Sequence, residues 1–180
     1  MNAEKLLLHC CCAPCAAVPL IKLQNKFKVS FYFYNPNIYP PEEYQKRFLE
    51  IKKYTDKLQV DLTQGDFEQQ RWQTAITGWE NMPEGGARCE KCYQLRLEQT
   101  AQYAKDNNIS WFSSTLSLSP HKSAEKINKI GQELAQQYNL KFYTADFKKE
   151  DGFKKSLEIS KAEGFYRQNY CGCQYSQRRD

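Results

Sequence analysis

The sequence lacks any apolar run long enough to cross a membrane. A membrane-spanning helix needs about 20 consecutive apolar residues, and no stretch of the 180 residues approaches that length. Residues 1–8 hold one lysine and three leucines, too short an apolar core for a secretory signal peptide. These absences predict a cytoplasmic chain with no membrane partner, in which the reducing environment keeps cysteines as free thiols.

The chain also has no basic or acidic tail, no internal repeat and no low-complexity segment. Its net charge of +5 is compatible with an RNA partner but does not require one. Hydrophobic residues make up 41% of the sequence and the mean hydropathy is -0.79, which indicates a packed core under a polar surface. We therefore expect one α/β catalytic domain over 1–180, with an irregular C-terminal segment at 164–180.

A glycine- and serine-rich loop is missing after the first expected strand, at 6–9. An ATP-using enzyme of alternating strands and helices needs such a loop, because its backbone amides wrap the phosphates. Cysteine and proline occupy that place in this chain, at 10–15. The sequence therefore argues against ATP as a cofactor.

Strand-like and helix-like segments alternate along the chain. Strands are expected at 6–9, 28–34, 60–63, 110–116 and 141–144. Segments with helical spacing of apolar residues lie between and after them, at 14–26, 42–58, 67–79, 89–106, 124–138 and 153–163. This alternation predicts a mostly parallel sheet of about five strands with helices on both faces, Rossmann-like or HUP-like. Ligands of such sheets bind at the carboxyl ends of the strands, where we expect a metal site.

Cysteine, by contrast, is abundant and falls into three groups. Because the chain is expected to be cytoplasmic, these thiols are candidate ligands or redox groups rather than structural disulfides. The first group precedes a helix that begins near Pro14, and helix N-termini favour anions such as thiolates. The groups are Cys10, Cys11, Cys12 and Cys15; Cys89 and Cys92; and Cys171 and Cys173.

The spacing of the first two groups indicates a metal. Cys89 and Cys92 are three residues apart at a helix start and so share one face. Zinc, iron–sulfur and redox sites all use such a pair. The adjacent residues Cys11 and Cys12 favour a 4Fe-4S cluster over one zinc ion, because neighbouring side chains diverge and a cluster offers separate iron atoms.

The remaining cysteines allow several interpretations. Cys171 and Cys173 flank one glycine, so they can hold a metal ion or close into a strained, easily reduced disulfide, and the alternative is a purely structural pair. Cys10 is expected to point away from Cys11 and receives no role. His9, beside it, is expected to be a structural residue at the end of the strand.

Six segments in chain order carry a more specific signal, at 8–15 (LHCCCAPC), 34–38, 88–92, 119–122, 146–149 and 166–173. Together they resemble the cobalamin-independent epoxyqueuosine reductase family (QueH) across nearly the whole chain. The resemblance implies an oxidoreductase that reduces the epoxide of epoxyqueuosine, at the wobble position of tRNA, to the alkene of queuosine. Two electrons are consumed and the oxygen leaves as water. The electron donor is not identified.

The resemblance also implies site residues. A 4Fe-4S cluster would be held by Cys11, Cys12, Cys89 and Cys92. The Cys171 and Cys173 pair would be catalytic, either as a redox-active disulfide or as ligands of a second, mononuclear iron, with Cys15 as a third ligand. Such an iron would polarise the epoxide oxygen as a Lewis acid. No cobalamin is expected.

Other polar residues are weaker candidates, because each also serves as an ordinary surface or structural group. Asp146 follows the last expected strand and would donate a proton, neighbour a metal, or cap a turn. Lysine and arginine would contact phosphate, and tyrosine would stack on an extruded base. The candidate substrate contacts are Tyr34, Asn35, His121, Lys122 and Arg167.

Three other functions use part of the pattern. A zinc-stabilised RNA-binding module without catalysis needs four cysteines and leaves the other four unexplained. An iron–sulfur tRNA sulfurtransferase needs the ATP loop that the sequence lacks. A metal-free thiol–disulfide reductase would contain no iron. None of the three accounts for all six segments.

Overall fold

The computed structural model of the protein describes residues 3–177. Five strands form one sheet in the order β3-β2-β1-β4-β5, and every neighbouring pair is parallel. The prediction of a parallel sheet of about five strands is confirmed. The strands are β1 (Glu4–His9), β2 (Phe27–Phe33), β3 (Leu62–Gln64), β4 (Trp111–Ser114) and β5 (Lys141–Phe142).

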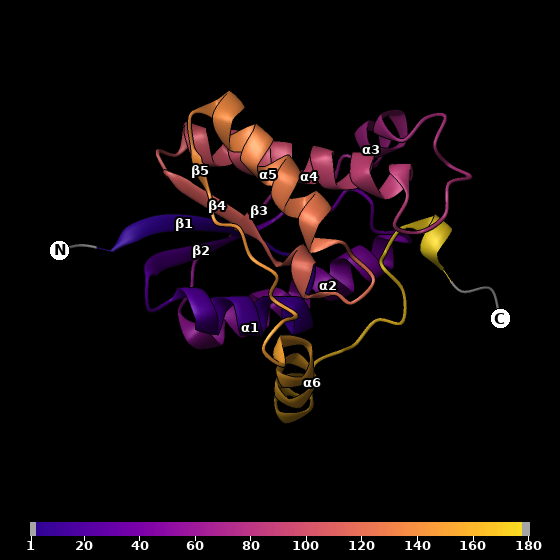
Figure 1. The fold of residues 1–180 in the computed structure, drawn as a ribbon. Coiled ribbons are helices and arrows are strands. Elements are labelled where there is room, and N and C mark those ends of the chain that lie inside the picture. Colours follow the sequence, from indigo (N-terminus) through magenta and orange to yellow (C-terminus); the bar gives the residue numbers. More distant parts are fainter. Residues whose placement is uncertain (1–2, 178–180) are drawn as a thin grey trace.

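Helices cover both faces of the sheet, as expected (Figure 1). One face carries α1 (Ala13–Leu23), α2 (Pro41–Leu58) and α6 (Gly152–Glu163). The other carries α3 (Gln69–Ala75), α4 (Ala87–Asp106) and α5 (Ala124–Tyr138). Two short 3-10 turns complete the structure, at Thr115–Leu118 and Gln174–Ser176. None of the described helices combines the length and apolarity that a bilayer crossing requires.

The alternation of side chains along β1 divides the core into two layers. Leu6 and Leu8 pack under α1 and α2, whereas Leu7, between them, packs under α4 and α5. All three side chains are at most 1% exposed. A central strand buried on both faces explains why the sequence of β1 is a continuous apolar run.

Two expected elements end earlier than the sequence suggested. The strand expected at 110–116 ends at Ser114, because the Ser114 hydroxyl accepts from the backbone N–H of Leu116 and starts a 3-10 turn. The helix expected at 67–79 ends at Ala75. Gly78, three residues later, adopts φ +83°, which turns the chain and leaves Trp79 38% exposed.

The strand order reverses between β1 and β4. From β1 the chain adds β2 and β3 on one side, and it later adds β4 and β5 on the other. The last residues of the two central strands, His9 and Ser114, are paired in register. Ligands of open α/β sheets bind in the crevice outside such a reversal. The first group of cysteines begins with the next residue after His9.

Candidate metal centre and adjoining cavity

The first cysteines occupy the turn from β1 into α1. Cys12 is the N-cap of α1 and has an extended backbone, with φ -173° and ψ 161°. This abrupt change from strand to helix places the Sγ atoms of Cys11 and Cys12 3.8 Å apart. Cys15, within the first turn of α1, adds a third sulfur, and all three lie within 4.8 Å of one another. Below, Cys11, Cys12 and Cys15 are called the three-thiol group.

The members of the three-thiol group differ in acidity. Hydrogen bonds from Cys12 and Cys15 hold the pKa of the Cys11 thiol well below its usual value. Hydrogen bonding to Cys11 in turn raises the pKa of Cys12 to about 12, and it raises the pKa of Cys15 well above its usual value. Cys11 is therefore the favoured thiolate, and the other two thiols lose protons when a metal binds.

The second pair, Cys89 and Cys92, lies in the first two turns of α4, and both side chains are buried. Burial raises the pKa of both thiols, that of Cys92 to about 11. The Cys171 and Cys173 thiols also raise both pKa values, so the second and third groups of cysteines are close enough to interact electrostatically. Within residues 3–177, none of these four sulfurs joins the three-thiol group at a spacing of 4.8 Å.

A buried guanidinium lies among the thiols. Arg96, one turn beyond Cys92 on α4, is 2% exposed. Its Nη1 donates to Cys92 Sγ at 4.0 Å and its Nη2 to Asn35 Oδ1 at 2.5 Å, whereas Nε has no partner among the described residues. Burial lowers the pKa of Arg96, but the Cys92 and Cys11 thiols outweigh it, so the pKa is raised. This positive charge favours thiolates in the site.

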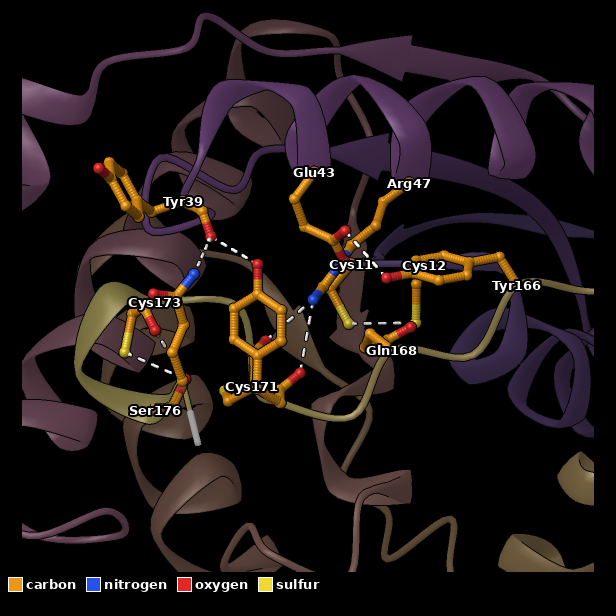
Figure 2. A network of polar contacts seen from close by, with 12 residues as sticks. Cys11, Cys12, Tyr39, Glu43, Arg47, Tyr166, Gln168, Cys171, Cys173 and Ser176 are labelled. Atoms are coloured by element: carbon orange, nitrogen blue, oxygen red, sulfur yellow. Dashed lines mark hydrogen bonds and ion pairs between the residues drawn. The ribbon is translucent and has the colours of Figure 1, made fainter. Parts of the chain in front are cut away.

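The third pair of cysteines is carried by the C-terminal segment, residues 164–177, which runs past the start of α2 and the Cys11–Cys12 turn (Figure 2). Cys171 is half-buried, Cys173 is buried, and both are free thiols. From the same segment, Gln168 Nε2 donates to Cys12 Sγ at 3.1 Å. The last part of the described chain therefore contacts the first group of cysteines directly.

A cavity of about 270 Å³ opens beside the thiols. Burial lowers the pKa of the Lys122 ammonium in its wall, but the nearby Cys171 and Cys11 thiols raise it by more, so the lysine is a cation. The wall thus combines thiols, cations and an apolar lining from Pro14 and Phe153. Of the predicted site residues, it contains Cys11, Cys15, His121, Lys122, Arg167 and Cys171.

In the described structure, the cavity lining does not include the other four predicted cysteines, nor the three remaining predicted site residues, Tyr34, Asn35 and Asp146. Tyr34 is fully buried, and its hydroxyl donates to Glu68 Oε2 at 2.7 Å. Asn35 is also fully buried. Asp146 forms an ion pair with Lys148, with an N–O distance of 3.0 Å. Their roles in substrate binding and proton transfer stay predictions.

His9 and Cys10, the first residues of the turn, have satisfied side chains. The two ring nitrogens of His9 contact Ser114 Oγ and the Tyr34 carbonyl oxygen, both at 3.1 Å. Burial lowers the pKa of His9 to about 3, so the imidazole is neutral. Cys10 is buried in the layer under α1 and α2, and its thiol donates to the Tyr32 carbonyl at 3.7 Å.

Sequence reasoning missed four charged residues that the structure buries beside the thiols, namely Glu43, Arg47, Arg88 and Arg96. The helical spacing contained a signal, because Arg47 falls on the same stripe as Tyr44 and Ile51 in α2. Arg96 similarly follows Cys92 by four residues in α4.

The donor set fits a metal centre. Thiolates select soft or borderline metals such as zinc, copper(I) and the iron of iron–sulfur clusters. The guanidinium of Arg96 offsets the negative charge that several thiolates would bring. Buried polar atoms without partners among the described residues, Trp72 Nε1 and Gln168 Oε1, mark the same region as one that can accept a further group. This cysteine cluster can therefore bind a metal.

Comparison with known protein families gives one match over almost the whole chain. The model of the family described as epoxyqueuosine reductase QueH matches residues 6–179. Among curated proteins, the epoxyqueuosine reductase QueH of Acinetobacter baylyi is 41% identical over 179 residues, which cover 98% of this chain and 82% of that protein. Its namesake from Thermotoga maritima is 36% identical over 174 residues, which cover 95% of this chain and 89% of that protein.

Solved structures with much lower identity share the fold. A predicted subunit of tRNA methyltransferase from Methanocaldococcus jannaschii superposes with a TM-score of 0.60 at 12% identity, covering 88% of this chain and 74% of that one. The U34-tRNA thiolase NcsA from Methanococcus maripaludis, solved with its 4Fe-4S cluster, gives a TM-score of 0.58 at 11% identity, covering 99% of this chain and 63% of that one. At such identities the likeness concerns the fold alone.

Proposed function

The chain belongs to the epoxyqueuosine reductase QueH family, and we propose that it reduces epoxyqueuosine in tRNA to queuosine. In this reaction the epoxide takes up two electrons and two protons, the two C–O bonds break, an alkene forms, and the oxygen leaves as water. The observation that carries the proposal is the family match over 6–179, which includes all the cysteines of the site.

The proposed cofactor is a 4Fe-4S cluster held by Cys11, Cys12, Cys89 and Cys92. When bound, such a cluster supplies single electrons at low potential. The donor chemistry supports it, because these four thiols are buried and two of them, Cys11 and Cys92, interact with the guanidinium of Arg96. Cys171 and Cys173 would act as a redox-active dithiol or, with Cys15, hold a second iron. The Cys15 sulfur also lies within 4.8 Å of those of Cys11 and Cys12, so its assignment to the second iron rather than to the cluster is part of this proposal.

The residues around the cavity would bind and shield the substrate. The cavity volume of about 270 Å³ is sufficient for part of an extruded nucleoside, and its apolar walls would exclude bulk water from the reacting carbons. Lys122 and Arg167 would contact phosphate groups of the anticodon. We propose that the enzyme works on tRNA in the cytoplasm and receives its electrons from a separate donor protein or small reductant.

The deciding experiment measures iron, zinc and acid-labile sulfide per chain, with a visible absorption spectrum, on protein purified without oxygen. About four irons and four sulfides are expected, together with conversion of epoxyqueuosine-containing tRNA to queuosine under dithionite, followed by nucleoside mass spectrometry. A colourless protein that holds zinc, lacks sulfide and stays so after reconstitution would contradict the proposal. It would favour the zinc-stabilised RNA-binding module instead.

A Cys171→Ser variant tests the division of roles among the cysteines. It is expected to lose turnover while keeping the visible absorption of the cluster, because Cys171 is assigned to the reaction and not to the cluster. If the absorption disappears with the activity, Cys171 is a cluster ligand and the proposed assignment is wrong. Cys89→Ser, assigned to the cluster, serves as the contrasting variant and is expected to lose both.

A further inference from the structure

The N-terminal half of α2 contains an ion pair that is buried, which is unusual for a charged pair on one helix. Arg47 Nε lies 2.7 Å from Glu43 Oε1, and the side chains are 1% and 10% exposed. A second pair of the same spacing on this helix, Lys52 and Asp56, also has a 2.7 Å contact but is more than half exposed at both residues. Burying a charged pair is costly unless its remaining donors and acceptors are satisfied.

The remaining hydrogen bonds of the buried pair all go to the C-terminal segment. Arg47 Nη1 donates to the Cys171 carbonyl oxygen at 3.1 Å, and Nη2 donates to the Tyr170 carbonyl oxygen at 3.4 Å. On the other side, the Tyr166 hydroxyl donates to Glu43 Oε2 at 3.0 Å. Figure 2 shows Glu43 and Arg47 between the Tyr166 ring and the backbone of Cys171. The pair therefore holds the segment at two points on either side of Gln168.

The backbone conformation of Gly172 permits the contact between Arg47 and Cys171. Its φ of +130° is one that side chains rarely allow, and a Cβ atom there would lie 3.0 Å from Arg47 Nη1. The Gly172 carbonyl also accepts from the Tyr39 backbone N–H at 2.8 Å. Glycine between the two cysteines therefore lets the guanidinium approach the Cys171 carbonyl, and a side chain at this position would push it away.

The same guanidinium also lies near the first cysteines. The Cys12 thiol, together with the hydrogen bond to Glu43, raises the pKa of Arg47 above what its burial alone would give. One side chain thus contacts the backbone of the last cysteine pair and interacts electrostatically with the first group. Residues 164–173 form no helix or strand, so no regular pattern of backbone hydrogen bonds holds them in place. Side-chain contacts such as those of Arg47 therefore help to fix the position of Cys171.

We propose that Glu43 and Arg47 form a buried clamp that sets the position of Cys171 relative to the Cys11–Cys12 turn. They are positioning residues: Arg47 holds the Cys171 backbone, and neither residue lines the cavity in the described structure. The inference rests on the proposed function in one respect, that Cys171 takes part in epoxide reduction. The placement of the segment by the clamp is a separate statement that can be measured without any turnover.

The test compares Arg47→Met and Arg47→Lys with the control Lys52→Met, in the full chain purified without oxygen. Hydrogen exchange of peptides covering 164–177 reports the placement of the segment. Arg47→Met is expected to speed exchange there by about tenfold or more while peptides from β1 and α4 keep their wild-type rates. Its kcat is expected to fall roughly a hundredfold at unchanged KM, because small misplacements of a reacting group have effects of that size.

Arg47→Lys separates charge from geometry. Lysine keeps the positive charge but cannot reach two carbonyls with one planar group. It is therefore expected to remain folded, yet to show fast exchange in the segment and a low kcat. Lys52→Met, which removes the exposed pair of the same helix, is expected to behave like the wild type in both measurements.

Two results would overturn the clamp. One is an Arg47→Met protein with wild-type exchange and wild-type kcat; the other is full recovery of both by Arg47→Lys, which would reduce the role of Arg47 to charge. Should Arg47→Met fail to fold, Tyr166→Phe removes a single hydroxyl, and unchanged exchange in that variant would equally refute the clamp. If the wild type reduces no epoxyqueuosine, the proposed function fails while the exchange measurement still decides the clamp.

Discussion

Replacing the buried Arg96 by methionine should weaken the metal-bound protein far more than the metal-free protein. No carboxylate pairs with Arg96 in the described structure, and its neighbours are Asn35 and the thiols. Since the pKa of Cys92 is about 11, this thiol is neutral at pH 7 without a metal. Among the neighbouring thiols, only Cys11, whose pKa is held well below its usual value, then helps to balance the buried guanidinium, and burying the charge stays costly. When the thiols bind a metal as thiolates, the same charge becomes favourable.

The structure gives the size of the second effect. Unit charges at the 4.0 Å separation of Arg96 Nη1 and Cys92 Sγ attract by about 4 kcal/mol at an effective dielectric constant of about 20. Loss of that attraction corresponds to about a thousandfold weaker metal retention. In the metal-free protein, relief of the buried charge is opposed by the lost attraction to Cys11 and by about 1–3 kcal/mol for the Asn35 oxygen that loses its donor. The unfolding temperature of the metal-free variant should therefore change much less than its metal retention.

The assay has two parts, with Arg96→Lys as the matched variant that keeps the charge. Thermal unfolding followed by circular dichroism is measured on metal-free protein, and the rate of metal loss to a chelator is measured on loaded protein. Arg96→Met should lose metal far faster than Arg96→Lys. If Arg96→Met retains metal as well as the wild type, the electrostatic reasoning is refuted. If its metal-free form is several kcal/mol less stable, the guanidinium acts mainly through its hydrogen bonds.

Three further predictions concern residues that are not proposed metal ligands. Cys10→Ala should keep its full metal content and lose about 1 kcal/mol of stability, and loss of metal on analysis would make Cys10 a ligand. Gly131→Ala should lower the free energy of unfolding, measured by urea titration, by about 1–3 kcal/mol despite the better helix propensity of alanine, because its Cβ would lie 2.4 Å from the Phe142 ring. A raised urea midpoint would show that the ring moves freely. Burial raises the pKa of Tyr32 to about 12, from about 10 in the unfolded chain. Between these two pKa values the unfolded chain loses the phenol proton and the folded protein keeps it. The contribution of Tyr32 to the free energy of unfolding is therefore intact below pH 10 and falls by about 1.4 kcal/mol per pH unit between pH 10 and 12. Tyr32→Phe should show a shallower loss of thermal stability over that range, and identical slopes for the two proteins would disprove the assignment.

The order of strands and helices could be predicted from the sequence because each element carries its own period. The apolar run at 6–9 and the helix expected at 42–58 are found almost unchanged as β1 and α2. Errors arose where a tertiary contact ends an element. Thr115 and Leu116 continue the segment at 110–116 with residues that suit a strand. The Ser114 hydroxyl, however, binds His9 and the Leu116 amide, and a single sequence does not reveal a partner 105 residues away.

The cysteine motifs predicted the location of the site but not its charge balance. Adjacent thiols after a strand and a Cys-x-x-Cys pair are local patterns, and the structure places both at the reversal of the sheet. The buried guanidiniums of Arg47 and Arg96 depend on contacts between distant segments. Spacing alone treats an arginine on an amphipathic helix as solvated, unless its place on the apolar stripe is given weight.

The distance along the chain between the first and last cysteines has a consequence for assembly during synthesis. The four proposed cluster ligands lie at the starts of α1 and α4, and the last of them, Cys92, precedes Cys171 by 79 residues. A growing chain therefore contains all the proposed cluster ligands before it contains the segment that contacts Arg47 and lines the cavity. Metal loading and closure of the cavity can then be separate events in time.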